Sequence, residues 1–350
     1  MKIALLTYFA SSSYGATLQT YATIKILKDL GHEVELVNYV IPESPRSKIK
    51  NILLMPKMLG LKRFREKRYG CSYSRPYKTI EELQNNPPNA DVYMVGSDQT
   101  WNSEISREKA RGIFLDFGDD KIKRVTYAAS FGKEVWTDNQ WMTKDDAKKL
   151  LSKFDSILIR EKSGQMILKE MFGISAEQVL DPVLLYKGYP ELTGTLQETN
   201  EIVTFKLLDS QPFYNKMIEL SKAVNLPIRI LGSLRRKKGF RCSYPESIEQ
   251  WVRKIGCSKY VITDSFHAMV VAMLHHRQFV VLKIIPERFT RLMDLLSMLH
   301  LDNRIISLED DIHTILNKLQ RPINWNEVDL ILDENRAKSI QFLKEELLCN

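Results

Sequence analysis

One histidine stands where enzymes built on open α/β sheets commonly carry out their chemistry. His267 follows residues 260–263, an apolar and β-branched run that predicts a buried parallel strand. Asp264 and Ser265 are residue types that start helices, and residues 268–274 predict the helix that follows. His267 is therefore expected in the first turn of a helix, just past the carboxyl end of a strand, where open parallel sheets bind ligands. Imidazole moves protons near neutral pH; the alternative is a structural histidine.

Polar groups also follow the predicted strand 91–95. Residues 96–102 place hydrogen-bond donors, an acid and an indole directly after it. Trp101 offers a ring face on which a sugar can stack, and Asp98 offers a carboxylate that accepts hydroxyl hydrogen bonds. The alternative is a turn that contains a buried tryptophan.

Arginine ends another predicted strand. Arg160 follows the buried run 156–159, and its guanidinium can bind a carboxylate or a phosphate through two parallel hydrogen bonds. An internal ion pair to Glu161 or Asp181 is the alternative. These groups together favour an anionic donor held by arginines, a sugar-like acceptor and a histidine that transfers protons.

Three further segments could reach an anion. Residues 11–16 follow the first predicted strand like a turn that cradles a phosphate, with Gly15 inside it. They lack the GxGxxG pattern of dinucleotide sites, and an ordinary helix cap with a glycine turn explains them equally. Arg288 near a helix start and Arg235 in a basic loop could also contact an anionic ligand, or simply be solvated.

The composition is that of a water-soluble globular protein of two domains. The chain has 350 residues, of which 44% are hydrophobic and 27% charged. No apolar run reaches the length of a bilayer, and the chain opens into a strand rather than a signal peptide. The scattered cysteines predict a reducing cytoplasm, and the absence of paired metal-ligand motifs predicts no tightly bound metal. We also expect no cofactor. The four cysteines are Cys71, Cys242, Cys257 and Cys349.

The net charge of +8 is concentrated in one segment. Residues 46–69 contain nine Lys/Arg and one acid, a net of +8, together with many large apolar residues. This mixture favours a helix on an anionic membrane surface. A helical insertion that packs on its domain and leaves its charges solvated is the alternative, and nucleic acid is disfavoured because no recognition motif accompanies the charge.

Strand and helix patterns alternate along the chain, which predicts parallel sheets covered on both faces. We expect an N-terminal domain over 1–185 with the basic insertion at about 46–69, a C-terminal domain over 200–322, and a helix over 326–350 that packs back on the first domain. Two α/β domains facing each other across a cleft are the expected architecture. The predicted strands are 2–8, 33–38, 91–95, 125–129, 156–159, 202–207, 228–231, 260–263 and 279–282. The predicted helices include 16–30, 161–172, 213–224, 247–255, 289–299 and 327–348.

At these residues the chain resembles the polysaccharide pyruvyl transferase family. The matching pieces keep the family's order from residue 3 to about 306. They are YGATLQTYA at 14–22, GHEV at 31–34 with NY at 38–39, GSDQTWN at 96–102, YAASFG at 127–132, REKSG at 160–164, VLDP at 179–182, TDSFH at 263–267, and Arg288 leading into LDNR at 301–304. The resemblance implies two Rossmann-like domains similar to GT-B glycosyltransferases. It also implies transfer of the enolpyruvyl group of phosphoenolpyruvate to a sugar, forming a pyruvate ketal.

The resemblance implies that His267 is the acid/base and that Arg160 grips phosphoenolpyruvate. From their positions we also expect the donor to contact Ser265, Arg288, Arg235 and Gly15. We expect the acceptor to contact Ser97, Asp98, Trp101, Asn102 and Gln19.

The chain departs from the family at two positions. Ser13 stands where many members have asparagine, and Ser265 where some have an arginine. Without that arginine, donor binding would pass to Arg288, Arg235 or the helix amino terminus.

The acceptor is expected to be a lipid-linked polysaccharide precursor, so that the basic segment would hold the protein at the inner membrane face. A glycosyltransferase using a nucleotide sugar is the main alternative, although no carboxylate for a ribose stands out in the second half. A glycan-binding or assembly protein on the same scaffold is the other.

Overall fold

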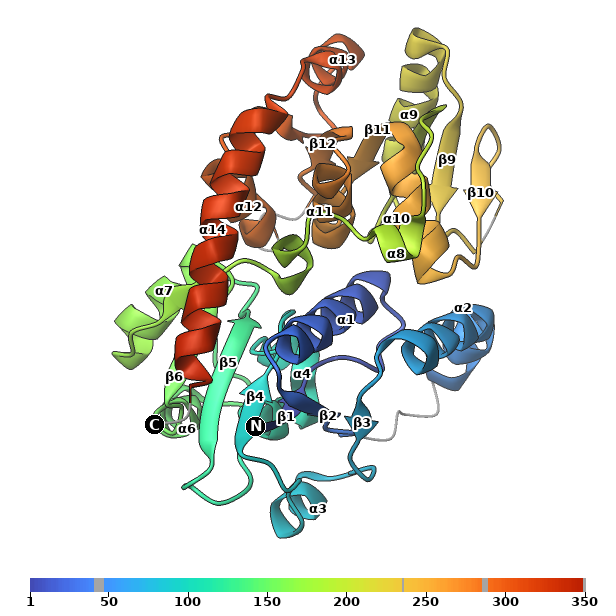
Figure 1. Ribbon diagram of the computed structural model, residues 1–350. Helices are drawn as coiled ribbons and strands as arrows, with labels where there is room; N and C mark the ends of the chain where they lie inside the picture. The colour runs from blue at the N-terminus through green and yellow to red at the C-terminus, as the bar shows by residue number, and fades with distance from the viewer. Residues whose placement is uncertain (41–46, 235, 285–288, 349–350) are drawn as a thin grey trace. The chain divides into compact units, whose positions relative to one another are not determined.

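The computed structural model describes residues 1–40, 47–234, 236–284 and 289–348. For residues 47–53 it describes the backbone alone. The chain divides into two compact units (Figure 1). The first contains Met1–Ile49, Arg65–Leu185 and Asp333–Asn350, and the second contains Lys50–Phe64 and Tyr186–Leu332. Helices α2 (Ser47–Arg68) and α14 (Trp325–Glu346) therefore contribute to both units.

The first unit is built on a seven-stranded parallel sheet in the order β3-β2-β1-β4-β5-β6-β7. Its central strands are short and apolar on both faces, as expected for a sheet covered by helices on each side. The strands are β1 (Lys2–Leu6), β2 (Glu33–Leu36), β3 (Ser72–Tyr73), β4 (Val92–Val95), β5 (Lys123–Ala129), β6 (Ser156–Ile159) and β7 (Glu177–Gln178). The helices are α1 (Tyr14–Asp29), α3 (Ile80–Asn85), α4 (Ser103–Ser106), α5 (Ala110–Ile113), α6 (Lys144–Leu151) and α7 (Lys162–Ile167), with short helical turns at Arg107–Lys109, Leu168–Phe172 and Pro182–Leu185.

The second unit has a six-stranded parallel sheet in the order β10-β9-β8-β11-β12-β13. Helix α10 shows how its helices form: Ser247 and Gln250 make a reciprocal capping box, and the apolar stripe of the helix is buried. The strands are β8 (Thr199–Phe205), β9 (Ile228–Leu231), β10 (Arg241–Ser243), β11 (Ser258–Thr263), β12 (Gln278–Leu282) and β13 (Ile305–Ile306). The helices are α8 (Pro190–Thr193), α9 (Gln211–Val224), α10 (Ile248–Cys257), α11 (Phe266–Leu274), α12 (Thr290–Met298) and α13 (Ile312–Gln320), with a turn at Asp302–Arg304.

In each sheet the order in which the strands are added reverses beside the first strand of that sheet. The reversal lies between β1 and β4 in the first unit and between β8 and β11 in the second. In sheets of this kind, ligands bind outside the carboxyl ends of the two strands at the reversal, because the crossover helices there lie on opposite faces. The predicted class, two Rossmann-like parallel-sheet domains, is confirmed.

The predicted elements differ from the observed ones mainly where elements are short. Strands β6 and β9 match their predicted ranges residue for residue. The predicted helix 161–172 is α7 followed by a π-helical turn at Leu168–Phe172. Edge strands β3, β7, β10 and β13 were not predicted because two or three residues carry no periodicity. The residues between the two predicted domains, 186–199, contain α8 and group with the second unit.

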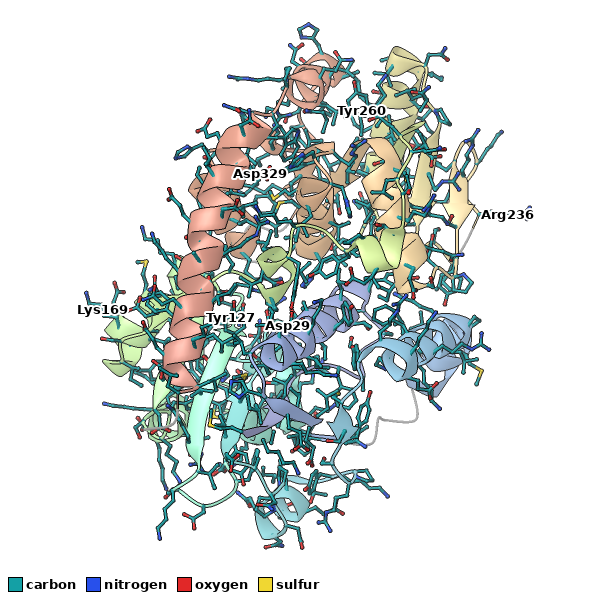
Figure 2. The ribbon with its side chains drawn as sticks, viewed as in Figure 1. Asp29, Tyr127, Lys169, Arg236, Tyr260 and Asp329 are labelled. Atoms are coloured by element: carbon teal, nitrogen blue, oxygen red, sulfur yellow. The ribbon has the colours of Figure 1, made fainter. Side chains whose placement is uncertain are left out.

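The segment after β7 is held in place from two sides within the first unit. Tyr127, labelled in Figure 2, is a buried residue of β5. Its hydroxyl donates to the Leu180 carbonyl at 3.1 Å. The Leu180 amide donates to Ser339 Oγ at 3.0 Å, and Arg336 Nε donates to the Leu184 carbonyl at 2.6 Å. The last part of α14 therefore fixes the segment that carries Asp181.

A buried arginine closes a helix end in the second unit. Arg304 is 1% exposed, and its guanidinium donates to the carbonyls of Lys318, at 2.6 Å, and Arg321 at the end of α13. Arg304→Met should lower the free energy of unfolding by about 2–4 kcal/mol, because two partly buried carbonyls lose a charged donor. Urea unfolding measures this loss. Arg321→Met is the control, since the exposed side chain is removed but the backbone carbonyl remains; equal loss in both variants would contradict the assignment.

Candidate active-site residues in the two units

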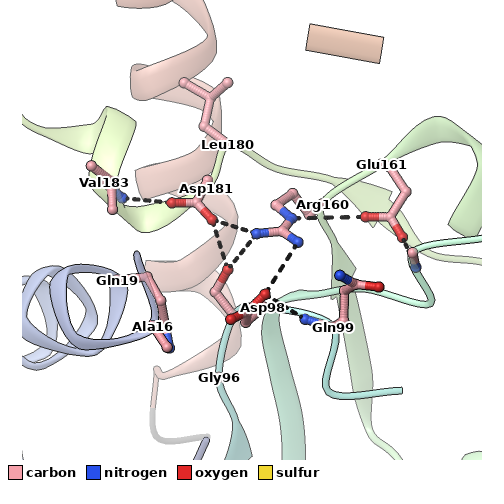
Figure 3. A network of polar contacts seen from close by, with 12 residues as sticks. Ala16, Gln19, Gly96, Asp98, Gln99, Arg160, Glu161, Leu180, Asp181 and Val183 are labelled. Atoms are coloured by element: carbon pink, nitrogen blue, oxygen red, sulfur yellow. Dashed lines mark hydrogen bonds and ion pairs between the residues drawn. The ribbon is translucent and has the colours of Figure 1, made fainter. Parts of the chain in front are cut away.

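A buried network surrounds Arg160 at the carboxyl ends of β4 and β6 in the first unit (Figure 3). Arg160 is 5% exposed, and its Nη1 donates to Asp181 Oδ2 at 2.7 Å. The same carboxylate oxygen accepts from Ser97 Oγ at 2.9 Å. Asp98 Oδ1 lies 3.9 Å from Nη2, and Glu161 Oε2 lies 3.9 Å from Nε. Three carboxylates therefore enclose one guanidinium.

The charge of this network opposes a further anion. Burial alone would lower the pKa of Arg160, but Asp181, Glu161 and Asp98 raise it, so the guanidinium stays charged. With all three carboxylates ionised, negative charge exceeds positive charge in the cluster. The internal ion pair, which was the alternative for Arg160, is confirmed by its contact with Asp181. A direct grip of Arg160 on an anionic donor is disfavoured by the same balance.

Asp98 is a partly exposed member of this network and has a strained backbone. Its side chain is 19% exposed, and its φ of +82° lies in a region that few residues other than glycine adopt. The strain is held by a parallel bridge to Ala129 and by the Gln99 amide, which donates to Asp98 Oδ1 at 2.9 Å. Strained residues held in this way concentrate at ligand sites. Asp98 is thus accessible for its predicted role, accepting a hydrogen bond from a sugar hydroxyl.

In the second unit, His267 lies in the first turn of α11, as the sequence predicted. Strand β11 ends at Thr263, and Ser265 caps α11 by accepting from the Ala268 amide. His267 is 7% exposed, and its ring meets the Phe266 ring edge-on with centroids 5.3 Å apart. The histidine therefore follows one of the two strands at the sheet reversal, held by a capped helix.

The loop after β8 is tied to the loop that precedes His267. The Asp264 carboxylate accepts from the Leu207 amide at 2.7 Å and from the Leu208 amide at 3.2 Å. These bonds hold Lys206, the first residue after β8, beside the start of α11. No sequence motif indicated Lys206 as a site residue. The feature that could have done so is its position directly after β8, one of the two strands at which the strand order of the second sheet reverses.

The sequence matches the family model of polysaccharide pyruvyl transferases over residues 14–284, which include both Arg160 and His267. The chain belongs to this family. No curated protein matches it by sequence.

Solved structures similar to this pyruvyl transferase family member are GT-B glycosyltransferases and epimerases. One is the UDP-GlcNAc 2-epimerase from Neisseria meningitidis bound to UDP-GlcNAc, with a TM-score of 0.57, 13% identity and 100% of each chain covered. The glycotransferase of kitacinnamycin gives 0.56 and 11% identity over 99% of each chain. A UDP-glucosyltransferase from Polygonum tinctorium gives 0.55 and 10% identity over 99% of this chain and 98% of its own. At these identities the likeness shows the fold alone.

Trp101 of this pyruvyl transferase family member is a core residue. It is 1% exposed and packs against Phe114, Phe131 and Phe154, with ring centroids 5.5, 5.4 and 5.5 Å away. No ring face is open to a sugar, so the predicted stacking role is wrong and the buried-turn alternative is confirmed. A depression at this place is lined by Trp101 itself and by neighbours including Trp136, which is half-buried.

Other predicted acceptor residues are committed to internal contacts. Ser97 is fully buried and donates to Asp181. Asn102 Nδ2 donates to Gln99 Oε1 at 3.1 Å, and the buried Gln19 Nε2 donates to Thr7 Oγ1 at 3.0 Å. These side chains shape the edge of the sheet, and the structure corrects the prediction that Ser97 and Gln19 contact the sugar directly.

The predicted donor residues have separate outcomes. Gly15 is buried in the first turn of α1, where the Ser13 side chain accepts from the Ala16 amide, so an ordinary helix cap accounts for the turn. Arg235 and Arg288 lie outside the described residues. Among the described residues, no three His, Cys, Asp or Glu side chains are arranged to hold a metal ion.

Replacing Trp101 separates a core role from a sugar-binding role. Trp101→Ala should lower the free energy of unfolding by about 3–5 kcal/mol, because a large buried ring leaves a cavity. Among the molecules that remain folded at low temperature, KM for the acceptor should be unchanged. Phe114→Ala, which removes a neighbouring buried ring, is the control for unfolding and kinetics; a stable Trp101→Ala protein with a raised acceptor KM would contradict the core role.

Proposed function

We propose that this protein transfers the enolpyruvyl group of phosphoenolpyruvate to two hydroxyls of one sugar in a lipid-linked polysaccharide precursor, forming a pyruvate ketal and releasing phosphate. The observation that carries the proposal is the position of His267 in the first turn of α11, at the strand reversal of the second sheet. Membership of the pyruvyl transferase family supports the reaction class. We propose that the reaction needs no metal and no cofactor.

The reaction needs one group that moves a proton. Protonation of C3 of phosphoenolpyruvate makes C2 electrophilic, and one sugar hydroxyl adds to C2. The C2–O bond to phosphate then breaks, and a second hydroxyl adds to complete the ketal. The two hydroxyls lose two protons, one balancing the proton gained at C3 and the other leaving with phosphate or solvent. His267 would supply the proton to C3, since imidazole exchanges protons near neutral pH.

The donor is an anion and needs positive charge around it. The carboxylates around Arg160 make the edge of the first sheet a poor site for phosphoenolpyruvate. The start of α11 is better suited, because a helix amino terminus favours negative charge. We therefore assign the donor to the start of α11 in the second unit.

Replacement of His267 tests the acid/base role. His267→Gln should reduce kcat for acceptor-dependent phosphate release by about 10²–10⁴-fold, because the general acid is lost while a similar side chain fills its place. KM for phosphoenolpyruvate and Tm should change little. His313→Gln, at an exposed histidine on α13, is the matched control. Near-normal turnover of His267→Gln would reject the assignment.

The acceptor panel tests the reaction itself. It contains simple and lipid-linked galactose, mannose and N-acetylhexosamine glycosides, with phosphate release from phosphoenolpyruvate as the readout. Release that depends on one acceptor supports ketal transfer, and mass spectrometry of the product identifies the bridged hydroxyls. Turnover of a nucleotide sugar without any use of phosphoenolpyruvate would favour the glycosyltransferase alternative.

Helix α2 carries two different faces. Leu61 and Phe64 are buried, so one face packs on the protein, as the insertion alternative predicts. Met55, Met58 and Leu59 are exposed at the i, i+3, i+4 spacing of a single helical face. Lys62 and Arg63, one turn farther along, are exposed next to them. Among the described residues, no helix is both long and apolar enough to cross a bilayer.

We propose that this exposed face lies on the anionic surface of the cytoplasmic membrane, where the lipid-linked acceptor would be found. Apolar side chains would enter the interface between headgroups and acyl chains while the lysine and arginine contact acidic headgroups, each contributing about 1 kcal/mol.

Liposome flotation tests the membrane surface. Met55→Ser/Met58→Ser/Leu59→Ser should abolish flotation with phosphatidylglycerol vesicles, because the residues that enter the interface are lost, and should leave turnover of a soluble acceptor intact. Leu330→Ser, at a leucine more exposed than any of the three, is the control. Equal binding to phosphatidylcholine vesicles, or flotation of the triple variant, would refute membrane docking through this face.

A further inference from the structure

Two cations flank the start of α11 within the second unit. Lys206 is the first residue after β8, and β8 pairs with β11 so that Phe205 lies opposite Thr263. Lys206 and Asp264 therefore leave adjacent strands at the sheet reversal. On the other side, Arg291 lies in the first turn of α12, with its guanidinium carbon 5.9 Å from the centre of the Phe266 ring. Phe266 is the first residue of α11, so both cations border the turn that carries His267.

The Lys206 ammonium is buried without a hydrogen-bond acceptor among the described residues. It lies 3.8 Å from the centre of the Phe213 ring, a cation–π contact that leaves its N–H groups unused. Burial lowers the pKa of Lys206, while Asp264 and Asp209 act in the opposite direction. The Asp264 carboxylate is already bonded to the Leu207 and Leu208 amides.

A buried ammonium with unused donors costs free energy in the folded protein. An anionic ligand would recover that cost by accepting the hydrogen bonds. A second buried polar atom at the same sheet edge has the same character: Thr290 at the start of α12 is 7% exposed, and its Oγ1 has no partner among the described residues. The strand order brings these groups to the ligand-binding end of the sheet.

We propose that Lys206 and Arg291 bind the phosphate and carboxylate of phosphoenolpyruvate on either side of His267. This inference rests on the proposed function and extends it, because it names the cations that replace an arginine at Ser265. Lysine supplies a compact charge for phosphate, and arginine supplies a planar fork that matches a carboxylate. The donor would then lie across the amino terminus of α11, with its C3 facing the proton-transferring side chain.

Calorimetric titration of the full-length protein with phosphoenolpyruvate and with inorganic phosphate tests the site. Lys206→Met and Arg291→Met should each raise Kd for phosphoenolpyruvate by about 10- to 100-fold, the loss expected for a hydrogen bond to a charged group. Lys206→Arg should retain most of the affinity. Lys222→Met, which removes an exposed lysine from α9, should bind like the wild type.

Thermal unfolding separates binding from a structural role. Lys206→Met should keep or raise Tm, because a buried ammonium with unused donors is replaced by an apolar side chain of similar length. A lowered Tm with an unchanged Kd would mean that Lys206 only pairs with Asp264, and would overturn the proposal.

The outcomes also separate this inference from the proposed function. Wild-type binding of phosphoenolpyruvate that neither Lys206→Met nor Arg291→Met weakens overturns the donor site and leaves the function intact. Binding of inorganic phosphate that depends on Lys206, without binding of phosphoenolpyruvate, supports an anion site but overturns the donor. Absence of binding for both anions overturns both proposals.

Discussion

The reversal of strand order is the constraint on which the chemistry of both units depends. Parallel strands require crossover helices, and where the order reverses these helices lie on opposite faces and leave the carboxyl ends of two adjacent strands uncovered. In the first unit these strands are β1 and β4, and Ser97 and Asp98 follow β4. In the second they are β8 and β11, followed by Lys206 and by the Asp264–His267 segment. The same topology thus offers two ligand edges with different side chains.

The two edges differ in how a buried cationic side chain is compensated by its neighbours. Arg160 is surrounded by Asp181, Glu161 and Asp98, so its guanidinium is paired with carboxylates of the first unit. Removing one member of such a set is costly because the remaining charge stays buried and unpaired. Lys206 has weaker compensation, since Asp264 is engaged by backbone amides. The guanidinium of Arg160 is thus compensated by carboxylates, whereas the ammonium of Lys206 has no hydrogen-bond acceptor among the described residues.

Local signals predicted what is local in the structure. The strand, cap and helix around His267 lie within a few consecutive residues, so their types alone indicated the geometry that Ser265 and α11 adopt. The role of Arg160 depends on Ser97 and Asp181, which are distant in sequence, and both the ion pair and donor binding were compatible with its position. The burial of Trp101 depends on Phe114, Phe131 and Phe154, whose packing no motif encodes. Lys206 was not predicted as a site residue, because its position near His267 depends on β8 pairing with β11.

Ser265 stands where some family members have an arginine, and two neighbouring elements carry cationic side chains instead. Ser265 is well suited to cap α11, and its side chain accepts from the Ala268 amide. A long cationic side chain in its place could not make that cap. With the serine, the helix start is held by its own side chain, and positive charge can come from the adjacent strand end and the next helix instead. The helix cap and the positive charge are then supplied by different residues, so a cationic side chain near the start of α11 does not remove the capping hydrogen bond.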